Sequence, residues 1–219
     1  MTFKLTKADF NKNPHLGIYF KANNEFLLAP KNTPEKTLKT LVETLEVTPI
    51  KMTIDNSHYL GIYGAMNDNG ILIPESISRD ELAILKKHFN VGEMPYPVCA
   101  ISNSVLCNNK YAAVSEDFPH KLQKIIADAL NVEVLTVKLE SHNVGAQGVA
   151  NNNGVLCGTL MHEHEQQQIE KIFKIKTIRG SVNFGLPYVN LGIIANDKGA
   201  VVGSNTTGIE IQKIYEGLS

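Results

Sequence analysis

The chain has 219 residues, of which 43% are hydrophobic and 20% charged, the composition of a soluble globular protein. A chain of this length buries on the order of 70% of its unfolded surface on folding, so it needs neither disulfides nor a structural metal. Its 21 basic and 22 acidic residues give a formal net charge of −1, with no run of Lys or Arg. This excludes the broad basic surface of a protein that binds nucleic-acid phosphates.

The cysteines indicate a reducing compartment. Cys99, Cys107 and Cys157 form an odd set without a CxxC motif, so we expect reduced thiols that pack in the core. The first residues, MTFKLTKADFNKN, lack the apolar core of a signal peptide, and no stretch reaches the roughly 18 apolar residues of a membrane span. We therefore expect a cytoplasmic protein.

One short pattern recurs along the whole chain: Asn, then Asn or Asp, then any residue, then Gly or an aromatic residue. Successive copies lie 41 to 45 positions apart. The five copies are Asn23–Phe26, Asn67–Gly70, Asn108–Tyr111, Asn151–Gly154 and Asn196–Gly199. Such a period predicts five repeated structural units of about 43 residues.

Each unit begins with a predicted β-hairpin. Short apolar segments flank every Asn cluster, as LGIYFKA and FLLAP do in the first unit, and Asn, Asp and Gly tolerate the positive φ of tight turns. A glycine lies six positions before the Asn in three units, at Gly17, Gly61 and Gly145, whereas the third unit has Ser102 and the fifth has Asn190. A glycine at a fixed place on a strand indicates a close approach of two backbones.

A helix is expected after each hairpin, because apolar residues then recur at i, i+3, i+4 and i+7. The apolar stripes are Leu38–Leu45, Leu82–Phe89, Leu122–Ala129, Ile169–Phe173 and Ile211–Leu218. Pro34 and Pro119 suit a first helical position. Ser78 to Glu81 and Thr207 to Glu210 have the spacing of a capping box.

A further strand is predicted after each of the first four helices, at 47–54, near 97–101, at 132–139 and at 175–178. The fifth helix has none, but the segment Thr2–Thr6 precedes the first hairpin and is free to fill that place. We therefore predict an α/β fold of five ββαβ-like repeats around a pseudo-fivefold axis, a ring closed by the N-terminal strand. The single domain would comprise repeats at about 7–53, 54–97, 98–140, 141–182 and 183–219, with 2–6 closing the ring.

Two stretches carry a family resemblance. The segment Ala100-Ile101-Ser102-Asn103 ahead of Cys107-Asn108-Asn109, and the run IIANDKGAVVGSNTTGIEIQKI, resemble the archaeal translation initiation factor six family. The resemblance extends from Asn13 to Ile214 and is most specific over Asn196–Glu210. It implies a pentein-type α/β propeller with no catalytic chemistry, cofactor or metal. Departures from the family pattern are Ser102, Asn205 and the helix start His162-Glu163-His164-Glu165.

The resemblance also implies a function. Such factors bind the intersubunit face of the large ribosomal subunit, contact ribosomal protein uL14 near the sarcin-ricin loop, and sterically prevent the small subunit from joining. They are tied to large-subunit maturation, act as monomers, and are released by a Shwachman-Bodian-Diamond-type protein with an elongation-factor-2-like GTPase. If the turns of units two and three face the ribosome, the contact candidates are Asn67, Asn69, Asn108, Asn109, Lys110 and Tyr111, with His58 as a further subunit contact.

A simpler interpretation competes for each of these residues, because Asn in a hairpin turn commonly serves only the turn geometry. Lys110 and Tyr111 break the Asn-Gly turn pattern, which favours a partner contact there.

His162 and His164 suggest a metal site, but residues two apart point to different sides of a helix, so we expect a solvated helix start.

Two other functions remain open. Enzymes that modify guanidine groups share five-bladed architecture and use a nucleophilic Cys with His and acidic residues. Here, however, Cys107 occupies a position that is Ala or Met in the other units, and no Cys occurs in the last 62 residues, so the enzyme function rests on fold analogy alone. A general interaction scaffold without a ribosomal role is the third interpretation.

Overall fold

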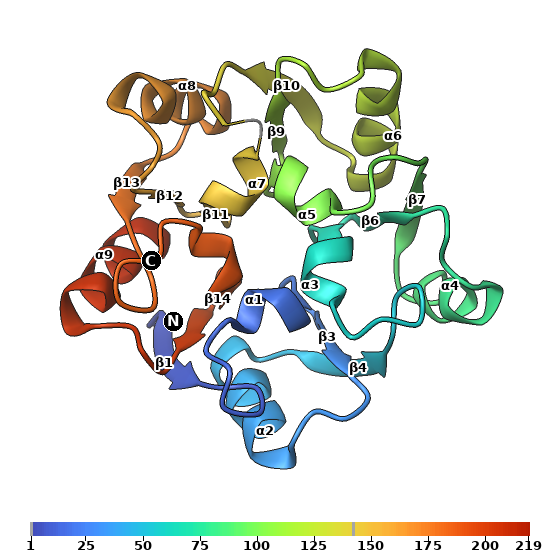
Figure 1. The fold of residues 1–219 in the computed structure, drawn as a ribbon, viewed down its shortest axis with the longest axis horizontal. Coiled ribbons are helices and arrows are strands. Elements are labelled where there is room, and N and C mark those ends of the chain that lie inside the picture. The colour runs from blue at the N-terminus through green and yellow to red at the C-terminus, as the bar shows by residue number, and fades with distance from the viewer. Residues whose placement is uncertain (1, 142) are drawn as a thin grey trace.

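The computed structural model describes residues 2–141 and 143–219, and it consists of five three-stranded sheets arranged about a common axis (Figure 1). Each sheet carries one long helix on the outside of the molecule and one short helix near the axis (Figure 1). The predicted mixed α/β fold of five repeats is therefore confirmed, and it is consistent with a pentein-type fold.

Every sheet has the same topology. The strand nearest the axis is short and antiparallel to the middle strand, and the third strand runs parallel to the middle one. The first four sheets contain, in chain order, β2 (Lys21–Ala22), β3 (Phe26–Pro30) and β4 (Thr48–Met52); β5 (Ala65–Met66), β6 (Gly70–Pro74) and β7 (Asn90–Met94); β8 (Leu106–Cys107), β9 (Tyr111–Ser115) and β10 (Glu133–Val137); β11 (Gly148–Ala150), β12 (Val155–Gly158) and β13 (Thr177–Gly180).

The fifth sheet joins the two ends of the chain. Strands β14 (Ile193–Ala195) and β15 (Gly199–Gly203) form its hairpin, and β1 (Lys4–Ala8) pairs with β15 in parallel, with Lys4 opposite Gly199. The N-terminal strand thus supplies the third strand that the last unit lacks, as the sequence predicts, although it begins and ends two residues later than the predicted Thr2–Thr6.

The five outer helices lie where the apolar stripes predict them, except that the second ends at Leu85 and leaves Phe89 of its stripe outside. They are α2 (Glu35–Leu45), α4 (Arg79–Leu85), α6 (His120–Leu130), α8 (Glu163–Phe173) and α9 (Gly208–Leu218). Both predicted capping boxes are present: the amide of Glu81 donates to Ser78 Oγ and that of Glu210 donates to Thr207 Oγ1, both at 3.3 Å. Pro34 and Pro119 fall at the N-cap, one residue earlier than predicted. Among the described residues, none of the helices combines the length and apolar character needed to cross a membrane.

The segment before each Asn turn differs from the prediction. It does not form one long strand: a single helical turn comes first, followed by a strand of two or three residues. These turns are α1 (Leu16–Tyr19), α3 (Leu60–Tyr63), α5 (Ile101–Ser104), α7 (Val144–Gln147) and the 3₁₀ turn η1 (Val189–Leu191). They surround the axis (Figure 1), and the repeated glycine sits in the helical turn rather than on a strand.

The close backbone approach inferred for that glycine is correct. A Cβ on Gly17 would lie 1.7 Å from the main-chain oxygen of Asn190, and one on Gly61 would lie 2.0 Å from that of Gly17. Only hydrogen fits there, so the short helices of neighbouring units touch backbone to backbone.

One predicted strand is wrong. The apolar run near 97–101 forms a loop that leads into α5, and the strand of this unit is β7, directly after α4. Helix α4 ends at Leu85, so the less apolar segment Asn90–Met94 is the one that reaches the sheet and pairs in parallel with Gly70–Pro74.

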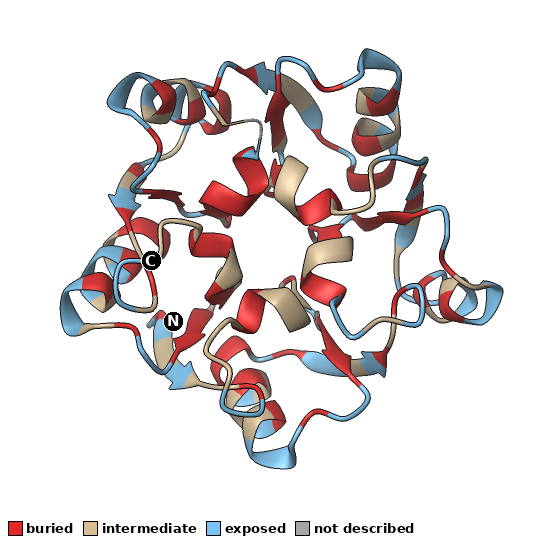
Figure 2. Ribbon diagram, in the orientation of Figure 1, coloured by how far each residue is buried: buried red, intermediate tan, exposed pale blue. Residues whose placement is uncertain are grey.

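The core is divided among the units. Buried residues form the inner side of every outer helix and most of the middle strands (Figure 2). Helix α6, for example, buries Leu122 and Ile126 in one cluster with Leu72 and Met94 of the preceding sheet. Each helix therefore seals the space between its own sheet and the neighbouring one.

Candidate interaction surfaces

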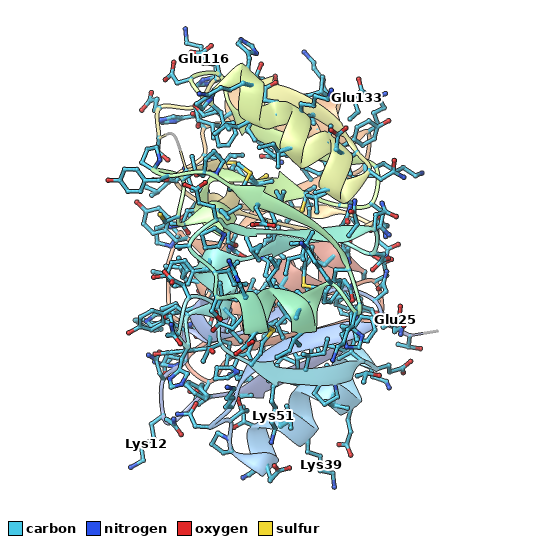
Figure 3. The ribbon with its side chains drawn as sticks, turned by 90° about the vertical axis from the view of Figure 1, so that its right-hand side faces the viewer. Lys12, Glu25, Lys39, Lys51, Glu116 and Glu133 are labelled. Carbon is cyan, nitrogen blue, oxygen red and sulfur yellow. The ribbon has the colours of Figure 1, made fainter. Side chains whose placement is uncertain are left out.

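The parallel strands give the molecule two distinct faces. All five middle strands begin at an Asn turn, so the turns at 23–25, 67–69, 108–110, 151–153 and 196–198 gather on one face, here called the turn face. The middle and third strands end on the opposite side, whose segments at 9–15, 53–59, 95–100 and 181–188 we call the loop face. In Figure 3, Glu25 and Glu133 mark the turn face, whereas Lys12 and Glu116 mark the loop face.

On the turn face, the first Asn of each repeat binds its own turn and its neighbours. Asn67 Oδ1 accepts from the amides of Asn69 (2.9 Å) and Gly70 (3.1 Å). Its Nδ2 donates to the main-chain oxygens of Asn108 (2.9 Å), in the next unit, and of Leu130 (2.8 Å), at the end of α6. One side chain thus fixes a turn, a helix end and the contact between two units.

The same bond to the next unit recurs five times and returns to the start. In each unit, Nδ2 of the first Asn of the turn donates to the main-chain oxygen of the equivalent Asn in the following unit. The fifth unit donates back to the first, from Asn196 to Asn23 at 3.0 Å. The second repeat residues are linked in a parallel series. The amide of Asn24, for example, donates to Asp68 Oδ1 and that of Asp68 donates to Asn109 Oδ1.

This network occupies the side chains of the asparagines that the sequence predicts as contact residues. Asn67 and Asn108 are 4% and 5% exposed, and their side chains are occupied by internal hydrogen bonds. Asn109 Nδ2 donates to Asp68, and Asn69 Nδ2 donates to Leu130 O at 3.0 Å although Asn69 is exposed. Internal hydrogen bonds, within a turn or between neighbouring units, therefore engage the side chains of all four asparagines.

Lys110 and Tyr111 differ from the asparagines. Lys110 is exposed on the turn face, and its side chain makes no hydrogen bond or ion pair with the described residues. Tyr111 is half-buried: its ring packs edge-on against Phe173, and Lys174 Nζ lies 4.8 Å from the ring centroid. Of the six turn-face candidates, Lys110 is thus the side chain most free to meet a partner.

His58 lies on the opposite face from the other candidates. It is exposed in the loop between β4 and α3, the counterpart of the loop that carries Lys12 in the first unit. The structure therefore separates His58 from Asn67, Asn69 and Lys110 by the thickness of the molecule, and no single flat partner contacts both sets.

Of the six exposed large apolar side chains in the described part of the chain, three lie on the loop face, which the sequence does not reveal. Tyr59 is 51%, Tyr96 80% and Phe184 84% exposed, and each lies in a loop of this face. Aromatic residues are enriched at protein interfaces, and removing the apolar surface of an exposed ring from water is favourable. This concentration marks the loop face as the better candidate interface.

Phe184 is also held in an unfavourable backbone conformation. Its φ is +64°, and its neighbours Asn183 and Gly185 are at +50° and +95°. A bulky residue in the left-handed region costs on the order of 1–3 kcal/mol. The loop keeps this shape because Glu210 accepts from the amides of Phe184 (3.2 Å) and Gly185 (2.8 Å) and from Ser181 Oγ (2.8 Å).

Glu81 holds the equivalent loop in the second unit. It accepts from the amides of Asp55 and Asn56, both at 3.1 Å, and from Thr53 Oγ1. Burial alone would raise the pKa of Glu81 and Glu210, but the hydrogen bonds that each carboxylate accepts outweigh it and lower the pKa of both. The capping-box carboxylates therefore stay charged at neutral pH and position the loops that carry Tyr59 and Phe184.

The groups considered for catalysis or metal binding are not arranged for either role. Burial raises the pKa of Cys107 to about 11 and that of Cys157 to about 12, so both remain unreactive thiols at neutral pH. His162 and His164 are exposed at the start of α8, as expected of a solvated helix start. Their rings stack with centroids 5.8 Å apart instead of pointing to different sides, because His162 is the N-cap rather than a residue of the helix. Within the part of the chain that the structure describes, no three His, Cys, Asp or Glu side chains converge as metal ligands would.

Comparison with known proteins agrees with this architecture. Residues 5–217 match the model of the eIF-6 family. The chain is 36% identical to translation initiation factor 6 of Saccharolobus islandicus, over 93% of this chain and 94% of that protein. It is 35% identical to the protein of the same name from Staphylothermus marinus, over 94% of each, and 33% identical to that of Thermococcus onnurineus, over 98% and 97%. The chain therefore belongs to the eIF-6 family of translation initiation factors.

Proposed function

We propose that this protein binds the intersubunit face of the large ribosomal subunit and sterically prevents the small subunit from joining, with a role in large-subunit maturation. Membership of an initiation-factor family supports a ribosomal function. The observation that carries the proposal is the Phe184 loop, where an 84% exposed aromatic side chain is held in a strained conformation by a buried carboxylate. Strain maintained at an exposed hydrophobic residue is characteristic of a binding site.

A steric role suits the shape of the molecule. The fold is built around internal hydrogen bonds and small cores shared by adjacent units, so it presents a preformed surface rather than a reactive group. A rigid body that covers part of one subunit's joining surface needs only affinity to block assembly. Nothing in the described cysteine and histidine environments favours the guanidine-modifying alternative.

We place the contact on the loop face, with Phe184 and Tyr59 as anchors and His58 beside them. A few aromatic anchors supply most of the energy of an interface of standard size, about 1,600 Å². The turn face, with Lys110 and Tyr111, is the competing contact surface. Asn67, Asn69, Asn108 and Asn109 would then reach a partner only where their internal bonds leave room.

The partner is expected to be a protein surface. A net charge of −1 offers little counterion release on RNA, which favours a protein as the main contact. The resemblance to the factor six family makes ribosomal protein uL14, near the sarcin-ricin loop, the proposed one. Binding there as a cytoplasmic monomer, the factor would be released by a Shwachman-Bodian-Diamond-type protein with an elongation-factor-2-like GTPase.

The proposal is tested by titrating the fluorescently labelled protein with isolated large and small ribosomal subunits from the same source. Affinity for the large subunit alone is the expected result. No affinity for either subunit would leave the general scaffold as the better explanation, and a partner pull-down would then be the next experiment.

Matched variants identify the face. Phe184→Ala and Tyr59→Ala are expected to weaken binding at least tenfold each, since truncation of an interface anchor costs about 2 kcal/mol or more. Lys110→Ala and Tyr111→Ala, on the opposite face, are expected to change it less than threefold. The reverse pattern would move the contact to the turn face while leaving large-subunit binding intact.

A further inference from the structure

A small internal cavity lies on the axis between the short helices and the Asn turns. Its volume, taken as the space that the centre of a water molecule can occupy, is about 50 Å³. Its walls include Lys21, Cys107 and Asn190. A single water needs on the order of 10–15 Å³ of such volume. The cavity therefore has room for several waters, or for one larger ligand with fewer waters.

Lys21 is the charged group of this cavity. Its Nζ donates to Ser102 Oγ at 2.8 Å and to Asn190 Oδ1 at 3.3 Å, and Asn190 Nδ2 donates to Ser102 Oγ at 2.9 Å. Ser102 is fully buried and Asn190 is 7% exposed. Three side chains thus form a polar cluster, of which Lys21 and Asn190 line the cavity and Ser102 lies behind them.

The cluster joins three of the five units and explains two irregularities of the repeat. Ser102 and Asn190 occupy the position that is glycine in the other three units, six residues before the repeat Asn. At Gly17, Gly61 and Gly145 a Cβ would collide with the main chain of a neighbouring unit. In units three and five the position instead carries a polar side chain that reaches Lys21 of the first unit.

The positive charge of Lys21 has no negative partner. Among the described residues that line the cavity there is no Asp or Glu, and Lys21 forms no ion pair within residues 2–141 and 143–219. Cys107, the other titratable group of the lining, donates its thiol hydrogen to Met66 O, and burial keeps it protonated at neutral pH. Burial lowers the pKa of Lys21 to about 8, so most of the ammonium is still charged at pH 7.

Hydrogen-bond donors are in excess at the same place. An ammonium group has three N–H donors, and Lys21 has two acceptors. Ser102 Oγ accepts from Lys21 and from Asn190 but is fully buried, so the third N–H of Lys21 is the spare donor available to the cavity. A partly buried cation with a spare donor and no carboxylate beside it is an environment that an anion satisfies.

We propose that the axial cavity is a binding site for a small monovalent anion of chloride size, held by Lys21 Nζ. The ion neutralises Lys21 and accepts its third N–H. Ser102 and Asn190, from the third and fifth units, hold the ammonium group in place beside the ion. The limited volume and the single positive charge disfavour divalent oxyanions such as sulfate.

Bromide, which has anomalous X-ray scattering, is the probe for this site. Crystals of the full chain grown with sodium bromide are expected to show an anomalous peak within hydrogen-bond distance of Lys21 Nζ. In solution, bromide and chloride are expected to raise the melting temperature above that in sodium fluoride at the same ionic strength, with one-site saturation. A cavity that contains only water, with equal melting temperatures in all three salts, would overturn the proposal.

Variants separate this site from general salt effects. Lys21→Met keeps the chain length but removes the charge, and it is expected to fold, because replacing a buried charge with an apolar chain is commonly tolerated. It should weaken bromide binding at least tenfold, whereas Lys36→Met, on the exposed side of α2, should leave it unchanged. Ser102→Gly restores the repeat residue and provides a second variant, expected to weaken binding at least threefold. Bromide stabilisation that is the same in wild type, Lys21→Met and Ser102→Gly would also contradict the site.

Discussion

The side-chain amide of Asn196 donates a 3.0 Å hydrogen bond to the main-chain oxygen of Asn23, 173 residues earlier in the chain. It also donates to Leu45 O at 2.8 Å, at the end of α2. One asparagine therefore links the last unit to both the turn and the helix of the first. The equivalent Asn in each other unit makes the same inter-unit bond, so the residues that define the repeat also hold the repeats together.

Replacing Asn67 with Ala should therefore destabilise the whole fold. The variant loses two bonds to Asn108 and Leu130 and leaves the amides of Asn69 and Gly70 without their acceptor. Loss of such buried partners is expected to cost about 3 kcal/mol in the free energy of unfolding, measured by urea denaturation. Lys110→Ala, on the same face, serves as the control and should remain within ~0.5 kcal/mol of wild type. An Asn67→Ala protein as stable as this control would show that the inter-unit bonds contribute little.

The repeated glycine of the short helices gives a second prediction. Gly17→Ala would place a methyl group 1.7 Å from the main-chain oxygen of Asn190, and the expected loss of stability is about 3 kcal/mol. Gly208→Ala, at the first residue of α9, meets no atom within 4 Å. That control should be neutral or stabilise by about 0.4–1 kcal/mol. Equal melting temperatures for the two variants would mean that the units do not pack backbone to backbone at the axis.

Glu210 should make the free energy of unfolding fall as the pH is lowered. Its pKa in the folded protein is lowered, because the hydrogen bonds from Thr207, Gly185 and Ser181 outweigh burial. A carboxyl group of this kind stabilises the fold above the unfolded-state pKa of about 4.3, and the contribution is lost as the pH falls through the lower folded-state value. Glu210→Gln should thus cost about 1–3 kcal/mol at pH 7 and progressively less below pH 4 in urea denaturation.

Two further observations complete that test. Glu25→Gln, which changes an exposed carboxylate, should leave the acid dependence unaltered. Because Glu210 holds the Phe184 loop, Glu210→Gln should also weaken large-subunit binding, even where the protein remains fully folded. Unchanged binding by a folded Glu210→Gln protein would mean that this loop needs no fixed conformation.

Ionic strength should affect ribosome binding only modestly. A protein with a net charge of −1 and no basic patch is expected to neutralise ~1–3 phosphates, which gives a log–log slope of about −1 to −3 at −0.9 per phosphate. The affinity for large subunits is to be measured between about 50 and 200 mM salt. A slope steeper than about −4 would show that RNA contacts dominate.

The five units were predictable because their signal is local and repeated. Asn151, for example, accepts hydrogen bonds from the amides of Asn153 and Gly154. Such bonds fix a turn through contacts within four residues. The outer helices were equally clear, since their apolar stripes and capping boxes are also local. The N-terminal strand was placed correctly only because the repeat count left one sheet incomplete.

The errors arose where tertiary contacts override local pattern. A four-residue apolar segment such as Leu16–Tyr19 is too short for periodicity to separate a helical turn from a strand. Similarly, Asn90–Met94 is a strand despite its polar sequence, because α4 ends early and the segment continues the sheet beside β6.

The candidate surfaces depended on strand direction, which no single motif encodes. His58 and Asn67 are nine positions apart in the sequence, yet they lie on opposite faces because α3 and β5 run between them. Phe184 carried no signal of its own, since a lone Phe in a Gly- and Pro-containing loop is unremarkable. Ser102 and Asn190 were visible as departures from the repeated glycine, but only the fold brings them to Lys21.

The proposed function, keeping the ribosomal subunits apart, is tested most directly by gradient sedimentation of a joining reaction. Purified large and small subunits from one source are mixed at raised magnesium concentration with stoichiometric wild-type protein or Phe184→Ala. The account predicts that the wild-type protein sediments with large subunits only and suppresses the joined particle, whereas Phe184→Ala permits joining. A wild-type protein that stays at the top of the gradient while joining proceeds normally would contradict it.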